Sequence, residues 1–366
     1  MTIIGFLIQE IGRILFKKGY KQHSDLIRGI NLYKNTPHDI KKPSFTCLKE
    51  VIMLFYYWNA FPDSYFRLGM FLKEFGSTDK MRSFIPQGAY CRYATDRDSR
   101  YHILIDDKII FHDLMTQYGL PVPTRFFTFR QGEFRHGANL LTDIEVNSIL
   151  KGISDERIFV KRFTGGAASG VSIFNKVGNG IYVDKDGDIV SAEMIRKKYY
   201  NQDFFFEKQI VQEPVLSQFN PETVNTIRVL TYNNQVISAT VRFGGRGEYV
   251  DNVSANGVAV SLDIETGILG DYGMKMYSTV ERFYSHPNSH IIFNGTKVTQ
   301  WPEVRSLVEK TLKYFPFYRS VGFDIATTNK GPVILEINTG AGINLSQMGK
   351  EYGLARFFKD IKYGNE

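Results

Sequence analysis

The chain has 366 residues, a formal net charge of +7 and a pI of about 9.1, with 43% hydrophobic and 23% charged residues. This length allows two or three domains with their own cores, and the composition excludes a disordered or fibrous chain. Lys and Arg do not form the blocks of a nucleic-acid-binding arm, so we expect no nucleic-acid partner. A basic surface suits an anionic nucleotide, an acidic sugar or an anionic membrane instead.

The two cysteines, Cys47 and Cys91, form neither a disulfide framework nor a CxxC motif. We interpret both as buried thiols in a reducing cytoplasm. The seven histidines show no metal-binding spacing and no HExxH motif. The cysteine content therefore predicts that the protein lies in the cytoplasm.

Apolar residues recur at helical spacing in the first 20 residues, at Ile4, Leu7, Ile8, Ile11 and Leu15. Glu10 and Arg13 interrupt this run and no cleavage site follows, so we predict neither a signal peptide nor a membrane span. The segment is interpreted either as a helix packed on its own domain or as a helix lying on a membrane surface.

Residues 48–75 are predicted to form further helix. The run Val51–Trp58 is strongly apolar but too short to span a bilayer, so we interpret it as core, with a docking surface for a membrane-associated partner as the alternative. Residues 76–101 are typical of loops and short elements. Residues 1–100 thus form a mostly helical N-terminal region, and residues 1–75 are the candidate for peripheral association with the inner face of a membrane.

Residues 105–129 predict a helix, a turn and a strand. Asp107 can cap a helix that begins with Lys108 and stops at Tyr118-Gly119. The prolines of Leu120-Pro121-Val122-Pro123 then lead into a strand at Arg125–Phe129.

The stretch 159–174 predicts a strand, a loop of small residues and a second strand. Such a loop exposes backbone N–H groups, which bind phosphate, and Lys161 stands at its entrance. The stretch matches neither the P-loop nor the GxGxxG fingerprint. We predict a hairpin lid that closes over a nucleotide, and an ordinary hairpin with a flexible tip is the alternative. The small residues of the loop include Gly165, Gly166, Ser169 and Gly170.

The other predicted elements follow from local periodicity and turn residues. They are a helix at 140–152, a turn at Asp186-Gly187 joining two strands, a basic helix at 192–201, a strand at 204–211, a hairpin of 224–232 and 236–242, a strand at 258–264, a helix at 301–314, a hairpin of 321–327 and 332–338, and a helix at about 346–361.

The last hairpin carries acidic groups within apolar strands. Glu336 and Asn338 are two residues apart, so they point to the same face, and Asp324 lies on the partner strand. Two carboxylates and an amide oxygen suit Mg²⁺. Without a cation the carboxylates would repel each other across the strands. We predict a magnesium site here, with solvated outward positions as the alternative.

Taken in order, these motifs resemble those of ATP-grasp enzymes. The carrying residues are Asp107-Lys108, the Gly-Leu-Pro-Val-Pro turn, the strand lysine with its small-residue loop, Glu207-Lys208, and Asp324 followed by Glu336-x-Asn338. The C-terminal half more closely resembles the branch associated with sugar transfer and surface-polysaccharide biosynthesis, through Asn225-Thr226-Ile227-Arg228, Arg242-Phe243-Gly244, Asp251-Asn252 and Gly322-Phe323-Asp324.

The resemblance implies an α+β ATP-grasp fold. Two α/β subdomains with mostly antiparallel sheets would clasp ATP, beside a helical N-terminal region. The expected boundaries are 1–100 for the N-terminal region, 101–208 for the subdomain with the lid loop, and 209–366 for the subdomain with the metal site.

The resemblance also implies a role for each candidate residue. Lys108 and Lys161 would hold the phosphates of ATP, and Gly165, Gly166, Ser169 and Gly170 would form the lid. Glu207 to Ile210 would be the adenine hinge, where the backbone of Lys208 and Ile210 reads the base, and Glu213 would bind the ribose. Asp324, Glu336 and Asn338 would bind two Mg²⁺, and Arg242 and Arg228 would face the transferred phosphate or an acidic substrate.

Two departures from the family pattern concern the substrate. The loop contains Ala167-Ala168, where glycine is common, and no arginine follows Asn338, where several ATP-grasp ligases carry one. The substrate geometry of any one ligase is therefore not transferred to this chain.

The implied activity is an ATP- and Mg²⁺-dependent carboxylate–amine ligation that proceeds through an acyl phosphate and releases ADP. A uronic-acid-type sugar unit joined to an amino acid or amine, in the biosynthesis of a capsule or other surface polysaccharide, fits the resemblance and the basic charge. Two alternatives stay open. One is an ATP-grasp phosphotransferase acting on a sugar, and the other is a nucleotide-binding module of a membrane-associated polysaccharide assembly complex.

Overall fold

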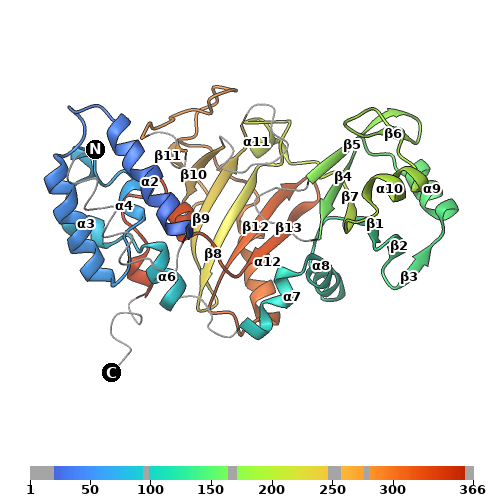
Figure 1. The fold of residues 1–366 in the computed structure, drawn as a ribbon, viewed down its shortest axis with the longest axis horizontal. Helices are drawn as coiled ribbons and strands as arrows, with labels where there is room; N and C mark the ends of the chain where they lie inside the picture. Colours follow the sequence, from blue (N-terminus) through green and yellow to red (C-terminus); the bar gives the residue numbers. More distant parts are fainter. Residues whose placement is uncertain (1–19, 94–98, 164–170, 246–256, 276–279, 359–366) are drawn as a thin grey trace. The chain divides into compact units, whose positions relative to one another are not determined.

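The computed structural model describes residues 20–93, 99–163, 171–245, 257–275 and 280–358 (Figure 1). The chain divides into two compact units. Unit 1 comprises Met1–Arg97, Pro214–Asp324 and Asn338–Glu366, and unit 2 comprises Asp98–Glu213 and Ile325–Ile337. Each unit has its own β-sheet, which confirms the predicted α+β architecture with mostly antiparallel sheets.

The sheet of unit 2 has seven antiparallel strands in the order β3-β2-β1-β7-β4-β5-β6. Its strands are β1 (Arg125–Arg130), β2 (Glu133–His136), β3 (Asn139–Leu141), β4 (Arg157–Arg162), β5 (Val171–Gly178), β6 (Ile181–Val183) and β7 (Phe204–Lys208). Its core is rich in phenylalanine, with Phe127 stacked on Phe206 at 4.4 Å between ring centroids. Aromatic side chains suit a pleated surface, which explains why much of the phenylalanine of this chain lies in strands.

Unit 2 contains four α-helices among the described residues, and α8 begins at its predicted cap. They are α7 (Ile103–Asp106), α8 (Lys108–Gln117), α9 (Asp143–Gly152) and α10 (Ala192–Tyr199), with a short 3₁₀ helix η2 (Ser99–Tyr101). The Asp107 carboxylate accepts hydrogen bonds from the N–H groups of Ile109 and Ile110 at the start of α8. A capping box between Thr142 and Glu145 starts α9. Gly119 ends the α8 region with φ of +61°.

The second sheet, most of which belongs to unit 1, has six strands in the order β11-β10-β9-β8-β12-β13. They are β8 (Thr226–Tyr232), β9 (Gln235–Phe243), β10 (Val258–Leu262), β11 (Leu269–Met274), β12 (Ser320–Thr328) and β13 (Gly331–Asn338). The division between the units falls within β12 and β13, because residues 325–337 belong to unit 2. Asn233 and Asn234 both have positive φ, as the predicted two-residue hairpin turn requires.

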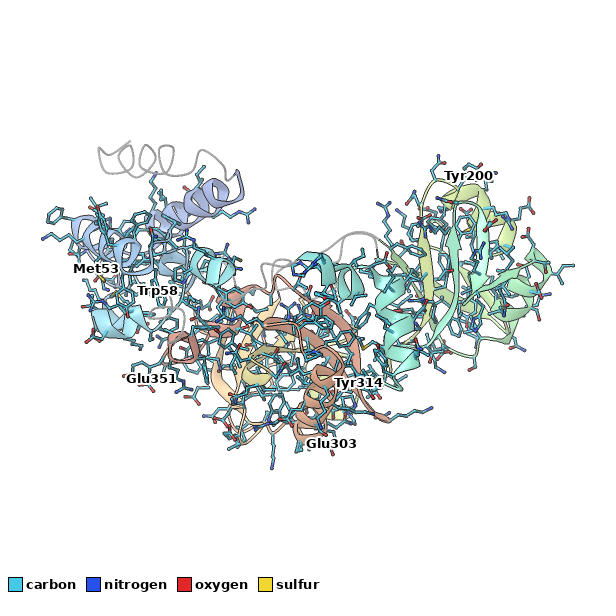
Figure 2. All side chains as sticks on the ribbon, turned by 90° about the horizontal axis from the view of Figure 1, so that it is seen from below. Met53, Trp58, Tyr200, Glu303, Tyr314 and Glu351 are labelled. Carbon is cyan, nitrogen blue, oxygen red and sulfur yellow. The ribbon has the colours of Figure 1, made fainter. Side chains whose placement is uncertain are left out.

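The long helix α12 (Trp301–Tyr314) turns one face toward the core of unit 1. Trp301, Val304, Leu307, Val308 and Leu312 are buried on that face, as the helical spacing predicts. Glu303 and Tyr314 project outward from the same helix (Figure 2).

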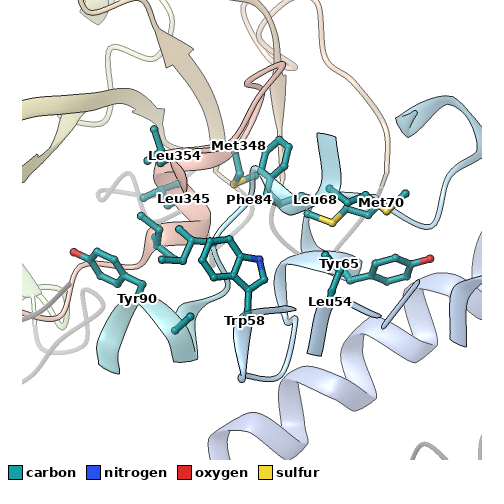
Figure 3. Close-up of a cluster of buried hydrophobic side chains, with 14 of the residues drawn as sticks. Leu54, Trp58, Tyr65, Leu68, Met70, Phe84, Tyr90, Leu345, Met348 and Leu354 are labelled. Carbon is teal, nitrogen blue, oxygen red and sulfur yellow. The ribbon is translucent and has the colours of Figure 1, made fainter. Parts of the chain in front are cut away.

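The N-terminal helices and the end of the chain share one core (Figure 3). The N-terminal helices are α2 (Tyr20–Asn35), α3 (Ser44–Trp58), α4 (Ser64–Arg67), η1 (Lys73–Phe75), α5 (Thr78–Arg82) and α6 (Gln87–Tyr93). The segment after the sheet contains α13 (Ile343–Gln347) and η4 (Ala355–Phe358), and α11 (Pro214–Ser217) precedes β8. The buried amide of Gln347 bonds to both backbone groups of Ile85, with its Nε2 donating and its Oε1 accepting at 3.0 Å. Leu54 and Trp58 from α3 pack in the same cluster as Leu345 and Met348.

Two predicted helices have different bounds in the structure. The helix predicted at 48–75 ends at Trp58, because Asn59 is left-handed and Pro62 follows. The helix predicted at 346–361 is wrong. Met348 is extended after α13 and Gly349 has φ of +67°, so only the short η4 follows within the described residues.

Other predictions needed smaller corrections. Strand β7 ends at Lys208 rather than at residue 211, and the turn at Asp186-Gly187 joins β6 to a single bridging residue, Ile189. Strands β2, β3 and β11 were not predicted. Cys47 is buried as expected, but Cys91 is exposed.

Within the described residues, no helix combines the length and the apolar character that crossing a membrane requires.

Candidate functional site

A lysine–glutamate pair lies on the sheet of unit 2. Glu207 on β7 stands directly opposite Phe159 on β4, and Lys161 is two residues from Phe159, so Lys161 and Glu207 share a face of the sheet. The Lys161 ammonium lies 2.7 Å from a Glu207 carboxylate oxygen. Glu207 is only 5% exposed, so its charge is desolvated and needs a partner. The register of two neighbouring strands therefore creates the pair.

Lys108 belongs to the same group of charges. It is the first residue of α8, directly after the Asp107 cap. Burial lowers the pKa of Lys108, the Glu336 carboxylate raises it, Lys161 lowers it further and Glu207 raises it. The charges of Glu336, Lys161 and Glu207 thus all act on Lys108, and the four residues belong to unit 2. Two partly buried ammonium groups this close together favour an added polyanion, such as a phosphate chain.

Arg125 completes this group and was not predicted from the sequence. It stands opposite Glu207 in the β1–β7 pairing, donates to the Lys108 carbonyl at 3.2 Å and pairs with Asp113 at 3.3 Å. Burial lowers the pKa of Arg125, against the opposing charges of Glu207, Asp113 and Asp107. Arg125 therefore ties the first turn of α8 to the sheet that carries Glu207. The pairing of Arg125 with Glu207 depends on the register of β1 and β7. The sequence around Arg125 indicates only the start of a strand, so it does not predict this pairing.

The predicted adenine hinge follows β7. The N–H of Lys208 donates to the Thr124 carbonyl at 2.8 Å, and its side chain pairs with Asp155 at 3.5 Å. Ile210 follows the end of the strand and is partly buried. Of the two backbone groups of Lys208, the N–H is therefore already committed within the protein, and its carbonyl is the group that could accept a hydrogen bond from a base.

Glu213 is buried beside β12. Its N–H donates to the Thr327 carbonyl at 3.2 Å, and its carboxylate accepts from the Thr327 hydroxyl at 3.1 Å. The contact with Thr327 fixes the carboxylate, and its predicted role in ribose binding stays a prediction.

The lid residues Gly165, Gly166, Ser169 and Gly170 lie outside the described residues. The strands that flank them are described, and Lys161 pairs with Val171 in the antiparallel β4–β5 register. The flanking segments therefore form the predicted hairpin strands.

In unit 1, two arginines hold one buried aspartate. Thr226 on β8 stands opposite Arg242 on β9, and Arg228 is two residues from Thr226, so all three share a face. Arg228 donates to both Asp324 oxygens, at 2.9 Å to Oδ2, and the Arg242 guanidinium lies 3.2 Å from Asp324 Oδ2. Arg242 also donates to the Thr226 hydroxyl, at 2.6 and 2.9 Å. Burial alone would raise the pKa of Asp324, but the two arginines lower it.

Gly322 makes this arrangement possible. Gly322 and Asp324 lie on one face of β12, and a Cβ added at residue 322 would lie 2.6 Å from the Ala341 Cβ and 3.3 Å from the Arg228 Cδ. The missing side chain leaves room for Arg228 to cross the strand and reach Asp324. The motif Gly322-Phe323-Asp324 is thereby explained by packing as well as by charge.

The predicted metal ligands occupy neighbouring strands. Glu336 and Asn338 are two apart on β13, and β13 lies beside β12, which carries Asp324. The Asn338 amide nitrogen is buried and has no hydrogen-bond partner among the described residues. Carboxylate and amide oxygens are the hard donors that Mg²⁺ prefers, but both Asp324 oxygens already accept hydrogen bonds from Arg228, so the magnesium site stays a prediction.

One other acidic cluster occurs among the described residues, in the turn after β6. Asp184, Asp186 and Asp188 come together there, and the Lys198 ammonium contacts all three carboxylates. These hydrogen bonds raise the pKa of Lys198. The lysine itself supplies the positive charge, so we interpret the cluster as a structural turn that holds α10.

Comparison with solved structures returns ATP-grasp ligases. The ligase PsnB, complexed with a phosphomimetic variant of minimal precursor, Mg and ADP, shares 15% identity with a TM-score of 0.41, over 72% of this chain and 60% of that one. A D-alanine–D-alanine ligase from Bacillus anthracis complexed with ATP shares 12% identity with a TM-score of 0.39, over 78% and 70%. A RiPP-associated ATP-grasp ligase from Chryseobacterium gregarium shares 11% with a TM-score of 0.39, over 74% and 62%.

The match to the PsnB chains covers 52–61% of their length. No curated protein matches this chain. The model of the sugar-transfer-associated ATP-grasp proteins matches residues 91–363, which is most of the sequence and includes every candidate site residue, and the chain therefore belongs to this ATP-grasp family.

Proposed function

We propose that the protein is an ATP- and Mg²⁺-dependent ligase that joins a carboxylate to an amine through an acyl phosphate and releases ADP. The observation that carries this proposal is that Glu336, Lys161 and Glu207 all act electrostatically on Lys108, while Lys161 pairs with Glu207 at 2.7 Å. A phosphate chain between the lysines would supply the negative charge that their burial favours.

Each part of the nucleotide has a candidate partner. Lys108 and Lys161 bind the phosphates, the Lys208 carbonyl and the Ile210 N–H bind the base, and Glu213 binds the ribose. Asp324, Glu336 and Asn338 hold two Mg²⁺ ions, which neutralise phosphate charge when they are bound. The small-residue loop with Gly165, Gly166, Ser169 and Gly170 covers the phosphates and keeps water from the reacting groups.

The chemistry needs no side-chain nucleophile. A substrate carboxylate oxygen bonds to the γ-phosphorus while the bond to the β–γ bridging oxygen breaks, and ADP leaves. The amine then attacks the acyl carbon, phosphate leaves with the former carboxylate oxygen, and the amine loses a proton. We propose that Arg228 and Arg242, which are held beside Asp324, neutralise charge on the transferred group or on an acidic substrate.

For the substrate, we propose a uronic-acid-type sugar unit and an amino acid or other amine, in capsule or related surface-polysaccharide biosynthesis. The sugar-transfer association of the family and the net charge of +7 support this choice. The cytoplasm, at the inner face of the membrane, is the location where such precursors and ATP meet.

The fate of oxygen tests the proposal. The protein is incubated with ATP, Mg²⁺, an amino-acid pool and glucuronic acid labelled with ¹⁸O in its carboxyl group, and products are read by mass spectrometry. An amide product together with phosphate that carries one ¹⁸O supports the ligase. A phosphorylated sugar would support a phosphotransferase instead, and the absence of both would support a nucleotide-binding module.

The N-terminal region has a feature that favours a membrane-associated role. Phe45, Ile52 and Tyr56 lie on one face of α3 and are 60%, 42% and 78% exposed, with Lys49 between them. Exposed aromatic and aliphatic side chains beside a lysine are typical of a helix on an anionic lipid surface. We propose that this α3 stripe, formed by Phe45, Lys49, Ile52 and Tyr56, attaches the enzyme peripherally to the membrane.

A further inference from the structure

A cavity of about 420 Å³ lies within unit 1, and none of the candidate nucleotide or metal residues lines it. Its walls come from α4 and the turn after it, from η1, from β11 and from the segment that follows α13. Phe84 and Leu68 on one wall belong to the core cluster that also contains Met348 (Figure 3). The volume is in the range of small-molecule sites.

The lining combines three kinds of side chain. Phe75, Phe84 and Tyr272 present aromatic surface, Asp271 and Glu351 present carboxylates, and Lys350 presents an ammonium group. Aromatic rings pack against the apolar face of a sugar ring, and carboxylates accept hydrogen bonds from its hydroxyl groups. A purely apolar ligand would leave the charged groups without partners.

Two of the four cationic side chains that line the cavity, Arg67 and Arg282, are already paired. Arg67 lies 3.5 Å from Asp63, and Arg282 lies 2.7 Å from Glu74. The Lys80 ammonium lies over the Phe75 ring, 5.1 Å from its centroid, and the Lys350 ammonium makes no hydrogen bond or ion pair with any described residue. Burial lowers the pKa of Lys350 to about 8, although the charge of Asp263 raises it, and Arg356 lowers it further. An ammonium in this setting favours a ligand that brings a negative charge.

We propose that this cavity binds an acidic monosaccharide, with the sugar carboxylate on Lys350 and the ring against Phe84 and Tyr272. The choice of a sugar rests on the proposed function, whereas the site itself is separate from the residues proposed to bind ATP. The cavity would hold a carboxylate-bearing sugar unit of the substrate other than the unit that reacts with ATP, and so give the enzyme its preference for acidic sugars.

The test is calorimetric titration without nucleotide, so that it does not depend on turnover. The probes are glucuronate, glucose and inorganic phosphate. We expect glucuronate to bind the natural protein at least tenfold more tightly than either of the others, since only glucuronate offers both the ring and the carboxylate. Phosphate binding as tightly as glucuronate, or no glucuronate binding, would overturn the proposal.

Variants locate the binding. Lys350→Met should weaken glucuronate binding about tenfold or more, while Lys310→Met, which changes an exposed lysine on α12 of the same unit, should leave it unchanged. Equal loss in both variants, or none in either, contradicts the assignment. If Lys350→Met does not fold, the pH profile of Lys350→Arg is measured instead.

Glucuronate binding to the natural protein should weaken as the pH rises through about 8, and Lys350→Arg should remove this pH dependence. An unchanged pH profile in Lys350→Arg would count against Lys350. Glucuronate binding without ATP turnover would refute the ligase alone, and the reverse result would refute this site alone.

Discussion

At the scale of single residues, the site depends on charges that are placed by strand register. Lys161 and Glu207 meet because β4 and β7 pair as they do, and Arg228 reaches Asp324 because residue 322 has no side chain. Neither contact is encoded within a few residues of sequence. The types of residue could be predicted, but their partners could not.

Gly322→Ala tests the packing of Arg228. Its Cβ would crowd Ala341 and Arg228, and overpacking of this kind costs about 1–3 kcal/mol. We expect lower stability in urea denaturation and a lower turnover of ATP. Gly340→Ala is the matched control, because an added Cβ there has no atom within 4 Å. Equal stability of the two variants would show that the gap at Gly322 has no role.

The pH dependence of ATP binding tests Lys108. Burial lowers its pKa, so its positive charge is lost at a lower pH than in free lysine. Bound phosphate favours the charged form, and ATP affinity should therefore fall as the pH rises through the lowered pKa. Measurement of KM for ATP across the alkaline range should show this rise in KM, and Lys108→Arg should flatten it. A variant that keeps the natural profile would assign the titration to another group.

At the scale of elements, helix starts position functional side chains. Asp107 caps α8 and so fixes the backbone of Lys108, whose carbonyl Arg125 also holds. This cap and the hairpin strands were predictable, since they rest on local rules of capping and alternation.

Two substitutions separate the cap from the site. Asp107→Ala and Thr142→Ala each remove an N-cap in unit 2, and each should cost about 1 kcal/mol of unfolding free energy. Only Asp107→Ala should also raise KM for ATP, because α9 carries no candidate site residue. An equal effect of both caps on KM would mean that Lys108 is not positioned by its helix.

The elements that sequence reasoning missed depend on distant contacts. The predicted helix at 346–361 does not form, because Gln347 is held by Ile85 and Leu354 and because Gly349 takes a left-handed turn. Strand β11 contains Gly270 and Gly273, because a Cβ at these positions would collide with Ser261 and Val258. Glycine is rare in strands, so the sequence of β11 does not show a strand pattern. Tertiary contacts override local propensity in both segments.

At the scale of the whole molecule, the N-terminal helices are part of the core of unit 1. Leu54, Trp58 and Phe84 share a cluster with Leu345 and Met348. Deletion of residues 1–90 should therefore leave no cooperative thermal transition for unit 1. A truncated chain that melts as sharply as the complete one would show that residues 91–366 fold alone.

Attachment to membranes tests the α3 stripe. The complete chain should sediment with vesicles that contain phosphatidylglycerol and not with vesicles of phosphatidylcholine alone, because the stripe offers both apolar surface and Lys49. Phe45→Ser combined with Tyr56→Ser should reduce sedimentation without a change in ATP turnover. The exposed Ile144→Ser on α9 serves as the control. Unreduced sedimentation of the double variant would exclude the stripe.

Calorimetric titration with Mg²⁺ and a non-hydrolysable ATP analogue tests whether the lysines of unit 2 bind the phosphates of ATP. The natural protein and Lys197→Ala, an exposed lysine on α10, should bind alike. Lys161→Ala should bind the analogue at least about tenfold more weakly, because a charge-assisted hydrogen bond worth about 1.5–3 kcal/mol is lost. Equal affinity of all three proteins for the analogue would show that Lys161 does not bind the phosphates.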